Sequence, residues 1–233
     1  RWVGILSGLL SLWLVLALFL TFSRTAWISL LAGLGVLTVG GKAKYFFLAL
    51  TVIMIGLLVW GLNVGPQAYW KQRIKGFSTW RSDPNIEKRL IYWDAAYRMI
   101  KQRPLFGYGP GYGIFISNYQ AGFKAVDTGE EVTAPHNYYL SLAVAGGMVG
   151  LGAFLALMAV VFRLSHLEYR SGSGWFGKSF ALGLISGLTG FLIGSLIDDP
   201  LLNERISFIF WILLGILGAR RASRKIISAI SDL

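Results

Sequence analysis

The chain has 233 residues, of which 55% are hydrophobic and only 14% charged, a composition too apolar for an ordinary soluble domain. It contains no cysteine, which excludes disulfide frameworks and thiolate metal sites. The net charge of +11 is interleaved with apolar blocks instead of gathered on one soluble face, which argues against a nucleic-acid partner. These properties predict a protein embedded among membrane lipids.

The first 62 residues consist of three apolar runs, residues 2–22, 26–41 and 45–62. The first contains 21 residues, enough to cross about 30 Å of hydrocarbon at ~1.5 Å per residue. Joined as one helix, the first two runs would be about 60 Å long, so the chain must turn between them. Residues 1–62 are therefore predicted to form three transmembrane spans. The sequence before them does not have the pattern of a signal peptide, and we expect the chain to be a piece of a longer polytopic protein.

A polar segment, residues 63–136, follows and is predicted to form a periplasmic loop. Residues 63–135 hold ten Lys/Arg and six Asp/Glu, too many charges for a lipid core. Between residues 86 and 103, apolar residues recur every three or four positions, which predicts a short amphipathic helix ending before Pro104. The apolar stripe consists of Leu90, Trp93, Tyr97 and Ile100, and the polar face of Lys88, Asp94, Arg98 and Lys101.

Three more apolar runs complete the chain, residues 137–162, 179–197 and 206–219. A polar link over residues 163–178 separates the first two, and the pair Asp198–Asp199 separates the last two. Residues 137–219 are therefore predicted to form three further spans, followed by a basic cytoplasmic tail over residues 220–233.

The charges in the short connections orient these spans. Ten Lys/Arg fall in the connections and ends on one side, and only Arg24 and Arg205 on the other. The positive-inside bias places the ten in the cytoplasm, and puts the large loop, Arg24 and His136 on the opposite face. The predicted fold is an all-α, polytopic membrane helix bundle with a large extracytoplasmic loop that contains a short amphipathic helix.

Two arginines are candidates for binding an anionic substrate. Arg24 lies between two apolar runs. It is either an interfacial arginine that reaches for water or a paired functional cation, since ionisable groups at such depth are costly. Arg89 precedes Trp93 by one helical turn and so shares the side of the apolar stripe; it either pairs with Glu87 or Asp94 or binds a ligand. A guanidinium group matches the paired oxygens of a phosphate.

His136 stands where the loop enters the next span, with Asn137, a secondary candidate for the site, beside it. A lone histidine is more often structural than catalytic. Histidine is also the side chain that titrates near neutral pH, so His136 is a candidate for taking a proton from an acceptor hydroxyl. Asp198 and Asp199 are predicted to cap a helix end; they are also rival candidates for a general base or a divalent-metal ligand.

The glycine-rich run Gly107-Tyr-Gly-Pro-Gly-Tyr-Gly113 follows the predicted helix. It lacks the Gly-Lys-Ser/Thr of a Walker loop and the strand and helix of a Rossmann turn. It is either a tight reversal or a set of backbone N–H groups, with Gly109 and Gly111 near its centre, that cradles an anion. No metal or cofactor is expected.

Taken together, several short motifs resemble those of the O-antigen ligase and O-antigen polymerase superfamily, whose members are polytopic membrane proteins. Their order along roughly residues 16–219 makes the resemblance specific, although each motif is modest alone. The matching pieces are Ser23-Arg24-Thr25-Ala26-Trp27, Arg89-Leu-Ile-Tyr-Trp93-Asp-Ala-Ala96, Arg103-Pro-Leu-Phe-Gly107-Tyr-Gly-Pro-Gly111, and His136-Asn137 leading into a span with Gly-Gly-Met-Val-Gly150.

The resemblance implies an inverting, metal-independent glycosyltransferase on the periplasmic face of the bacterial inner membrane. The implied donor is a glycan on undecaprenyl diphosphate, and the implied acceptor is a hydroxyl of lipid A-core or a similar lipid or glycan. It assigns Arg24 and Arg89 to the diphosphate and His136 to activation of the acceptor.

Two alternatives stay open within the superfamily. One is a polysaccharide polymerase, in which the acceptor is another lipid-linked repeat. The other is a transport-associated protein of the inorganic carbon accumulation type. Transport needs a polar path between the helices, and the predicted spans offer only small, scattered hydroxyl residues: Ser7, Ser11, Thr38, Thr51, Ser141, Ser186, Thr189 and Ser195.

Overall fold

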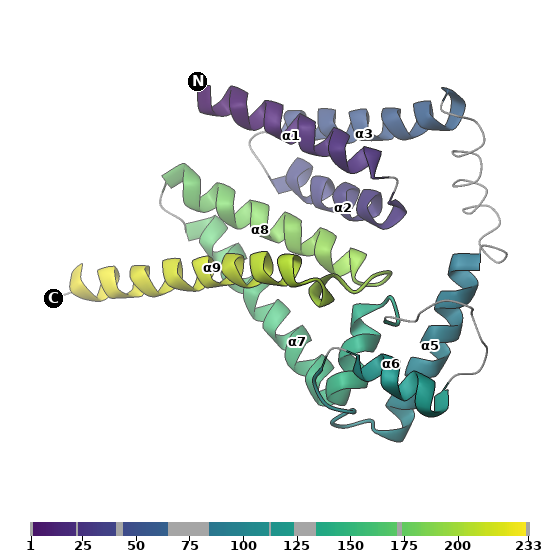
Figure 1. Ribbon diagram of the computed structural model, residues 1–233. Coiled ribbons are helices and arrows are strands. Elements are labelled where there is room, and N and C mark those ends of the chain that lie inside the picture. Colours follow the sequence, from purple (N-terminus) through teal and green to yellow (C-terminus); the bar gives the residue numbers. More distant parts are fainter. Residues whose placement is uncertain are drawn as a thin grey trace.

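The computed structural model describes residues 2–21, 23–40, 44–64, 84–111, 113–123, 134–171 and 174–231. Every regular element in these ranges is a helix, which confirms the predicted all-α membrane fold. Figure 1 shows long helices running roughly side by side, with α7 crossing them obliquely and α5 and α6 gathered beside one end of the bundle. The elements are α1 (Trp2–Leu20), α2 (Arg24–Gly40), α3 (Lys44–Val64), α5 (Pro84–Gln102), α6 (Ile114–Asn118), a π-helical turn (Tyr119–Phe123), α7 (Tyr138–Ser171), α8 (Gly174–Gly194), a 3-10 turn (Pro200–Leu202) and α9 (Glu204–Ser231).

Six of these helices are apolar, as expected of a membrane protein. Three are long and apolar enough to cross a bilayer, over Tyr138–Arg170, Phe176–Gly194 and Glu204–Ser223. Three shorter apolar helices cover Gly4–Leu20, Arg24–Val39 and Lys44–Leu57. The side of the membrane on which the ends lie stays a prediction.

The polar residues expected as a link and a tail are largely helical. α7 continues to Ser171 and α8 begins at Gly174, so most of residues 163–178 extend two helices. α9 likewise runs to Ser231. An ion pair joins α7 and α9 in this region. The guanidinium group of Arg220 donates two hydrogen bonds to the carboxylate of Glu168, which is fully buried.

The helix α7 is folded back on itself at Gly147, which has a left-handed φ of 63° and a ψ of −164°. The rings of Tyr138 and Phe154 lie 5.4 Å apart, whereas 16 residues of straight helix would separate them by about 24 Å. Residues 138–146 therefore form a short arm, and the long stretch across the bilayer begins at Met148. The sharp turn is centred on Gly147.

The helices α2 and α8 approach each other closely through small residues. A Cβ added at Gly190 would lie 2.5 Å from the carbonyl oxygen of Ser29, and the hydroxyl of Ser186 donates a 2.8 Å hydrogen bond to the carbonyl of Gly33. Small residues let two membrane helices pack at this distance. The start of α2 is thereby held beside the end of α8.

The helix α5 occupies the segment where an amphipathic helix is predicted, but it buries a different stripe. Its buried residues, with Phe115, Tyr119 and Val144, form one core that joins α5 to α6 and to the short arm of α7. Leu90 and Tyr97, assigned to the apolar stripe, are 49% and 54% exposed. Small alanine side chains on the other face allow the neighbouring helices to approach, and this decides which face is buried. The buried residues of α5 are Tyr92, Ala95, Ala96 and Met99.

Candidate functional site

Asn137, the residue after His136, caps the amino-terminal end of α7. Its side-chain oxygen accepts hydrogen bonds from the backbone N–H groups of Tyr139 (3.1 Å) and Leu140 (3.2 Å), which is the geometry of a helix N-cap. Its side-chain nitrogen donates to the carbonyl of Leu196 at 3.1 Å. The structure thus uses Asn137, a secondary candidate in the sequence, to fix the helix start against the connection that follows α8.

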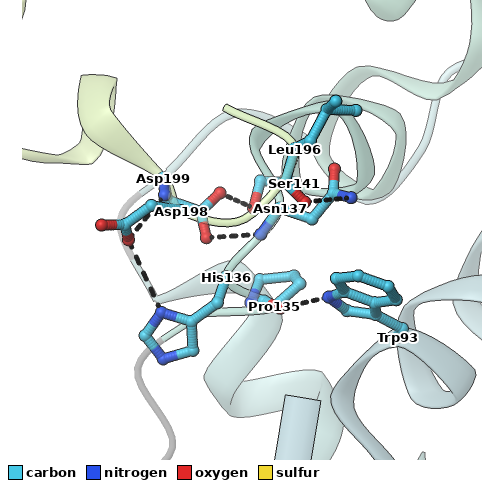
Figure 2. A network of polar contacts seen from close by, with 8 residues as sticks. All are labelled: Trp93, Pro135, His136, Asn137, Ser141, Leu196, Asp198 and Asp199. Carbon is cyan, nitrogen blue, oxygen red and sulfur yellow. Dashed lines mark hydrogen bonds and ion pairs between the residues drawn. The ribbon is translucent and has the colours of Figure 1, made fainter. Parts of the chain in front are cut away.

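His136 has a left-handed backbone conformation, with φ of 54°, which is uncommon for a residue other than glycine. Such a conformation costs about 1–2 kcal/mol and persists only where neighbours hold it. Hydrogen bonds on both sides do so (Figure 2): the indole N–H of Trp93 donates to the carbonyl of Pro135 (2.9 Å), and the backbone N–H of Asn137 donates to Asp199 (3.1 Å). The ring of His136 is therefore presented in a set direction.

The ring of His136 faces the carboxylate of Asp198. Nδ1 of His136 lies 3.7 Å from Oδ1 of Asp198, a distance that suits an ion pair better than a direct hydrogen bond. Both side chains are partly open to solvent. The neighbouring His136 side chain lowers the pKa of Asp198 below its usual value, and the hydrogen bond from the backbone N–H of Asp199 acts in the same direction. Asp198 is therefore a carboxylate at neutral pH, placed to orient the imidazole.

Asp199 points the other way, into the protein. Its carboxylate accepts hydrogen bonds from the hydroxyl of Ser141 and the backbone N–H of Asn137. Burial raises the pKa of Asp199, and these two hydrogen bonds offset part of that effect. Asp199 thus ties the connection after α8 to the short arm of α7.

The prediction that the aspartate pair caps a helix end is wrong for Asp199. It precedes the 3-10 turn, but its side chain makes no capping hydrogen bond there. The physical reason is that the carboxylate of Asp199 already accepts hydrogen bonds from Asn137 and Ser141 at the start of α7. Among the described residues, no group of three or more His, Asp or Glu side chains surrounds this pair as a metal ion would need.

Arg89 belongs to the same group of charges. Its positive charge contributes to the lowered pKa of Asp198. Asp94, one of its predicted partners, pairs with Arg98 at 3.0 Å. Arg89 and Trp93 are one turn apart on α5, so the hydrogen bond that holds the backbone before His136 also places Arg89 on that side. The structure therefore brings Arg89, His136 and Asp198 together.

Arg24 lies at the same end of the bundle, as the first residue of α2. Ser23 caps this helix, accepting from the backbone N–H of Ala26 (3.3 Å). The methyl carbon of Thr25 would lie 3.8 Å from a Cβ at Gly194, the last residue of α8. Asp198 in turn donates its backbone N–H to the carbonyl of Gly194 (3.0 Å). Arg24 thus stands beside the helix end from which the aspartate pair extends. As the first residue of α2, Arg24 opposes the macrodipole of that helix, whereas the carboxyl end of α8 beside it favours a cation, so the two effects act in opposite directions.

The glycine-rich run is built into the break of α7. The backbone N–H groups of Tyr108 and Gly109 donate to the carbonyls of Val144 (2.9 Å) and Ala145 (2.8 Å). These N–H groups are therefore occupied and do not form the anion cradle considered from the sequence. The carbonyl of Gly111 accepts from the backbone N–H of Ile114 (3.4 Å), which makes this part of the run a tight turn.

Some residues of the site carried no usable signal in the sequence. Trp93 looked like one of several apolar residues of a helix, and Ser141 like a small residue of a span. Their partners, Pro135 and Asp199, lie 42 and 58 residues away along the chain, so only the folded structure pairs them.

The hydroxyl residues scattered through the apolar runs are engaged within the protein. Six donate to carbonyls three or four residues back in their own helices, and Ser186 and Ser141 donate to α2 and Asp199. All eight side chains are therefore hydrogen-bonded within the part of the chain that the structure describes. The six are Ser7, Ser11, Thr38, Thr51, Thr189 and Ser195.

Comparison with known proteins gives two matches. A family model described as O-antigen ligase matches residues 9–155. A curated protein of Pseudomonas aeruginosa, named O-antigen ligase, is 30% identical over 170 residues, which cover 72% of this chain and 37% of that protein. The chain thus spans little more than a third of this relative's length. No solved structure matches the chain.

Proposed function

Because the chain belongs to the O-antigen ligase family, we propose that the protein carrying it is a membrane glycosyltransferase of the O-antigen ligase type. It transfers a glycan from undecaprenyl diphosphate to a hydroxyl of lipid A-core or a similar acceptor, on the periplasmic face of the bacterial inner membrane. One observation carries the proposal: a histidine held in a strained conformation faces a carboxylate, with the charge of Arg89 acting on the same carboxylate.

The reaction is a displacement at the anomeric carbon of the donor sugar. The acceptor oxygen forms the new bond to that carbon while the imidazole of His136 takes the proton of the acceptor hydroxyl. The bond between the anomeric carbon and the diphosphate oxygen breaks, and the diphosphate leaves with its electron pair. Attack from the face opposite the leaving group inverts the anomeric configuration. Asp198 orients the ring and stabilises the imidazolium that forms.

The two arginines act on the leaving group in this scheme. Negative charge grows on the diphosphate as the bond breaks, and fixed guanidinium groups stabilise it without needing to reorganise. Arg89 is placed by α5, and Arg24 by the start of α2. Loss of one such donor costs on the order of 10²–10³ in rate. In this scheme the guanidinium groups do the work that a divalent cation does in many phosphate sites.

The test is a transfer assay with the full-length protein in liposomes, supplied with a lipid-linked donor and a purified acceptor. We expect His136→Ala and Arg89→Ala to reduce the transfer rate at least about 10²-fold. Lys101→Ala is the matched control, because it removes an exposed cation from the same helix, and it should keep normal activity. Full activity of His136→Ala would refute the assigned role.

The choice of acceptor separates the two enzymatic alternatives. Lipid A-core as the acceptor gives a product of fixed length and identifies a ligase. A second lipid-linked repeat as the acceptor gives a ladder of products and identifies a polymerase. Transfer to neither acceptor, with a donor that an authentic ligase accepts, would contradict the proposal.

A further inference from the structure

The loop that joins α5 to α6 exposes large apolar side chains although it lies in the segment expected to be polar. Leu105 and Phe106 are 61% and 73% exposed. They stand beside Met148 and Val149 of α7, which are 53% and 51% exposed. Four neighbouring apolar side chains, each more than half open, are unusual on a surface that faces water.

Backbone hydrogen bonds fix the position of this loop along the axis of α7. The N–H groups of Met148 and Val149 donate to the carbonyls of Pro104 (2.8 Å) and Leu105 (3.2 Å). In the other direction, Tyr108 and Gly109 donate to the carbonyls just before the break. Residues 104–109, which we call the docked loop, thus complete the hydrogen bonding of both helix ends created at Gly147.

The docked loop and the break of α7 pack backbone against backbone. A Cβ at Gly107 or at Gly147 would come closer than 3.0 Å to the backbone of the facing segment, a separation that real Cβ atoms essentially never show. Both glycines also have left-handed φ values, 64° and 63°. The side chains of Leu105 and Phe106 are therefore held level with the first turn of residues 148–171.

That first turn is where the long, apolar part of α7 begins. The apolar stretch after the break, residues 148–162, is 15 residues, about 22 Å of helix, which is shorter than the hydrocarbon core of about 30 Å. With the polar residues from Arg163 onwards at the opposite boundary, Met148 and Val149 lie inside the hydrocarbon boundary on the side of His136. Because Leu105 and Phe106 are bonded to the same turn, they lie inside that boundary too.

The residues that precede the docked loop have the polarity of a membrane interface. Gln102 and Arg103 are exposed, and the guanidinium group of Arg103 stacks over the ring of Tyr108 (4.7 Å). The hydroxyl of Tyr108 donates to Gln102 (3.0 Å). Arginine and tyrosine concentrate at the headgroup level of bilayers. The chain therefore changes from the polar pair Gln102–Arg103 to the apolar pair Leu105–Phe106 within about two residues. Such a change is typical of a segment that inserts into one leaflet of a bilayer.

From these observations we infer that the docked loop is a membrane anchor, inserted through Leu105 and Phe106 among the acyl chains of the leaflet on the side of His136. The anchor continues the lipid-facing surface of α7 onto α5. It holds α5, and with it Arg89, flat against the headgroup layer. This inference concerns the position of the loop and does not depend on the proposed reaction.

Site-directed spin labelling tests the anchor. The 233 residues contain no cysteine, so single cysteines are introduced as Phe106→Cys and, as a matched control, Gln102→Cys. The full-length protein is used in phospholipid vesicles, with any cysteine outside these residues replaced by serine. Collision of each label with oxygen, which concentrates in lipid, is compared with collision with a water-soluble nickel chelate. Both positions are exposed, so folding is preserved, and Leu105→Cys is the second lipid-side position.

We expect the Phe106 and Leu105 labels to collide severalfold more with oxygen than with the nickel chelate, and the Gln102 label to show the reverse. If the Phe106 label collided with the chelate as often as the Gln102 label does, the loop would lie in water. Shelter of the Phe106 label from both reagents would mean that protein covers it. Either result overturns the inference.

Discussion

Substitution of Gly147 by alanine probes the fold-back of α7 most sharply. Alanine at a φ of 63° costs about 1–2 kcal/mol. Its Cβ would also collide with the carbonyl of Leu105, so the docked loop must shift and at least one of its hydrogen bonds must break. A buried polar group left without a partner costs about 1–3 kcal/mol. The sum is about 2–5 kcal/mol, a large part of the ~5–15 kcal/mol by which proteins are stable.

The neighbouring residue provides the control. A Cβ at Gly146 meets nothing within 4 Å, and its φ is not left-handed. Gly146→Ala therefore gains helix propensity and should be neutral or stabilising by up to about 1 kcal/mol. Thermal unfolding of the two variants in detergent, followed by tryptophan fluorescence, gives the comparison. A Gly147→Ala variant that melts together with Gly146→Ala would refute the fold-back and the docked loop with it.

Three further predictions concern the contacts around the site and the bundle. Trp93→Phe removes the indole donor from the buried carbonyl of Pro135; we expect a loss of about 1–3 kcal/mol in thermal unfolding, with slower glycosyl transfer and normal donor affinity. Burial raises the pKa of Asp199. Its protonated form therefore stabilises the fold, and this contribution is complete below the ordinary pKa and is lost as pH rises through the raised value. The melting temperature of the wild type should fall as pH rises above the ordinary range of an aspartate, and it should fall less in Asp199→Asn; an unchanged slope would contradict the burial of the carboxyl. Arg220→Met leaves the carboxylate of Glu168 buried without its guanidinium group and should destabilise by about 3–5 kcal/mol. Adding Glu168→Leu should restore most of that stability, and a double variant no more stable than Arg220→Met would argue against the pair.

The sequence was informative where local patterns decide structure. Runs of apolar residues located the helices, because length and composition alone determine which segments suit a bilayer. The position of His136 at a loop exit, and of Arg24 between two apolar runs, was enough to select them as candidates. These inferences need no knowledge of which segments meet.

The remaining features depend on contacts between distant segments. A glycine inside an apolar run is common in membrane helices, so nothing local distinguished Gly147, where α7 folds back, from Gly152, which continues the helix. The docked loop is held by backbone groups, which leave little trace in residue type. The buried stripe of α5 was missed because Leu90 and Tyr97 are apolar on a face that the neighbouring helices do not cover.

The most direct test of the proposed function is equilibrium binding of undecaprenyl diphosphate to the purified full-length protein and to Arg89→Ala and His136→Ala. The account predicts that the wild type binds, that Arg89→Ala weakens binding at least about tenfold, or ~1.4 kcal/mol, and that His136→Ala leaves the affinity unchanged. The first result would place the diphosphate beside α5, and the second would separate donor binding from acceptor activation. Failure to bind, or binding indifferent to Arg89, would contradict the account and leave the family relationship without the proposed donor.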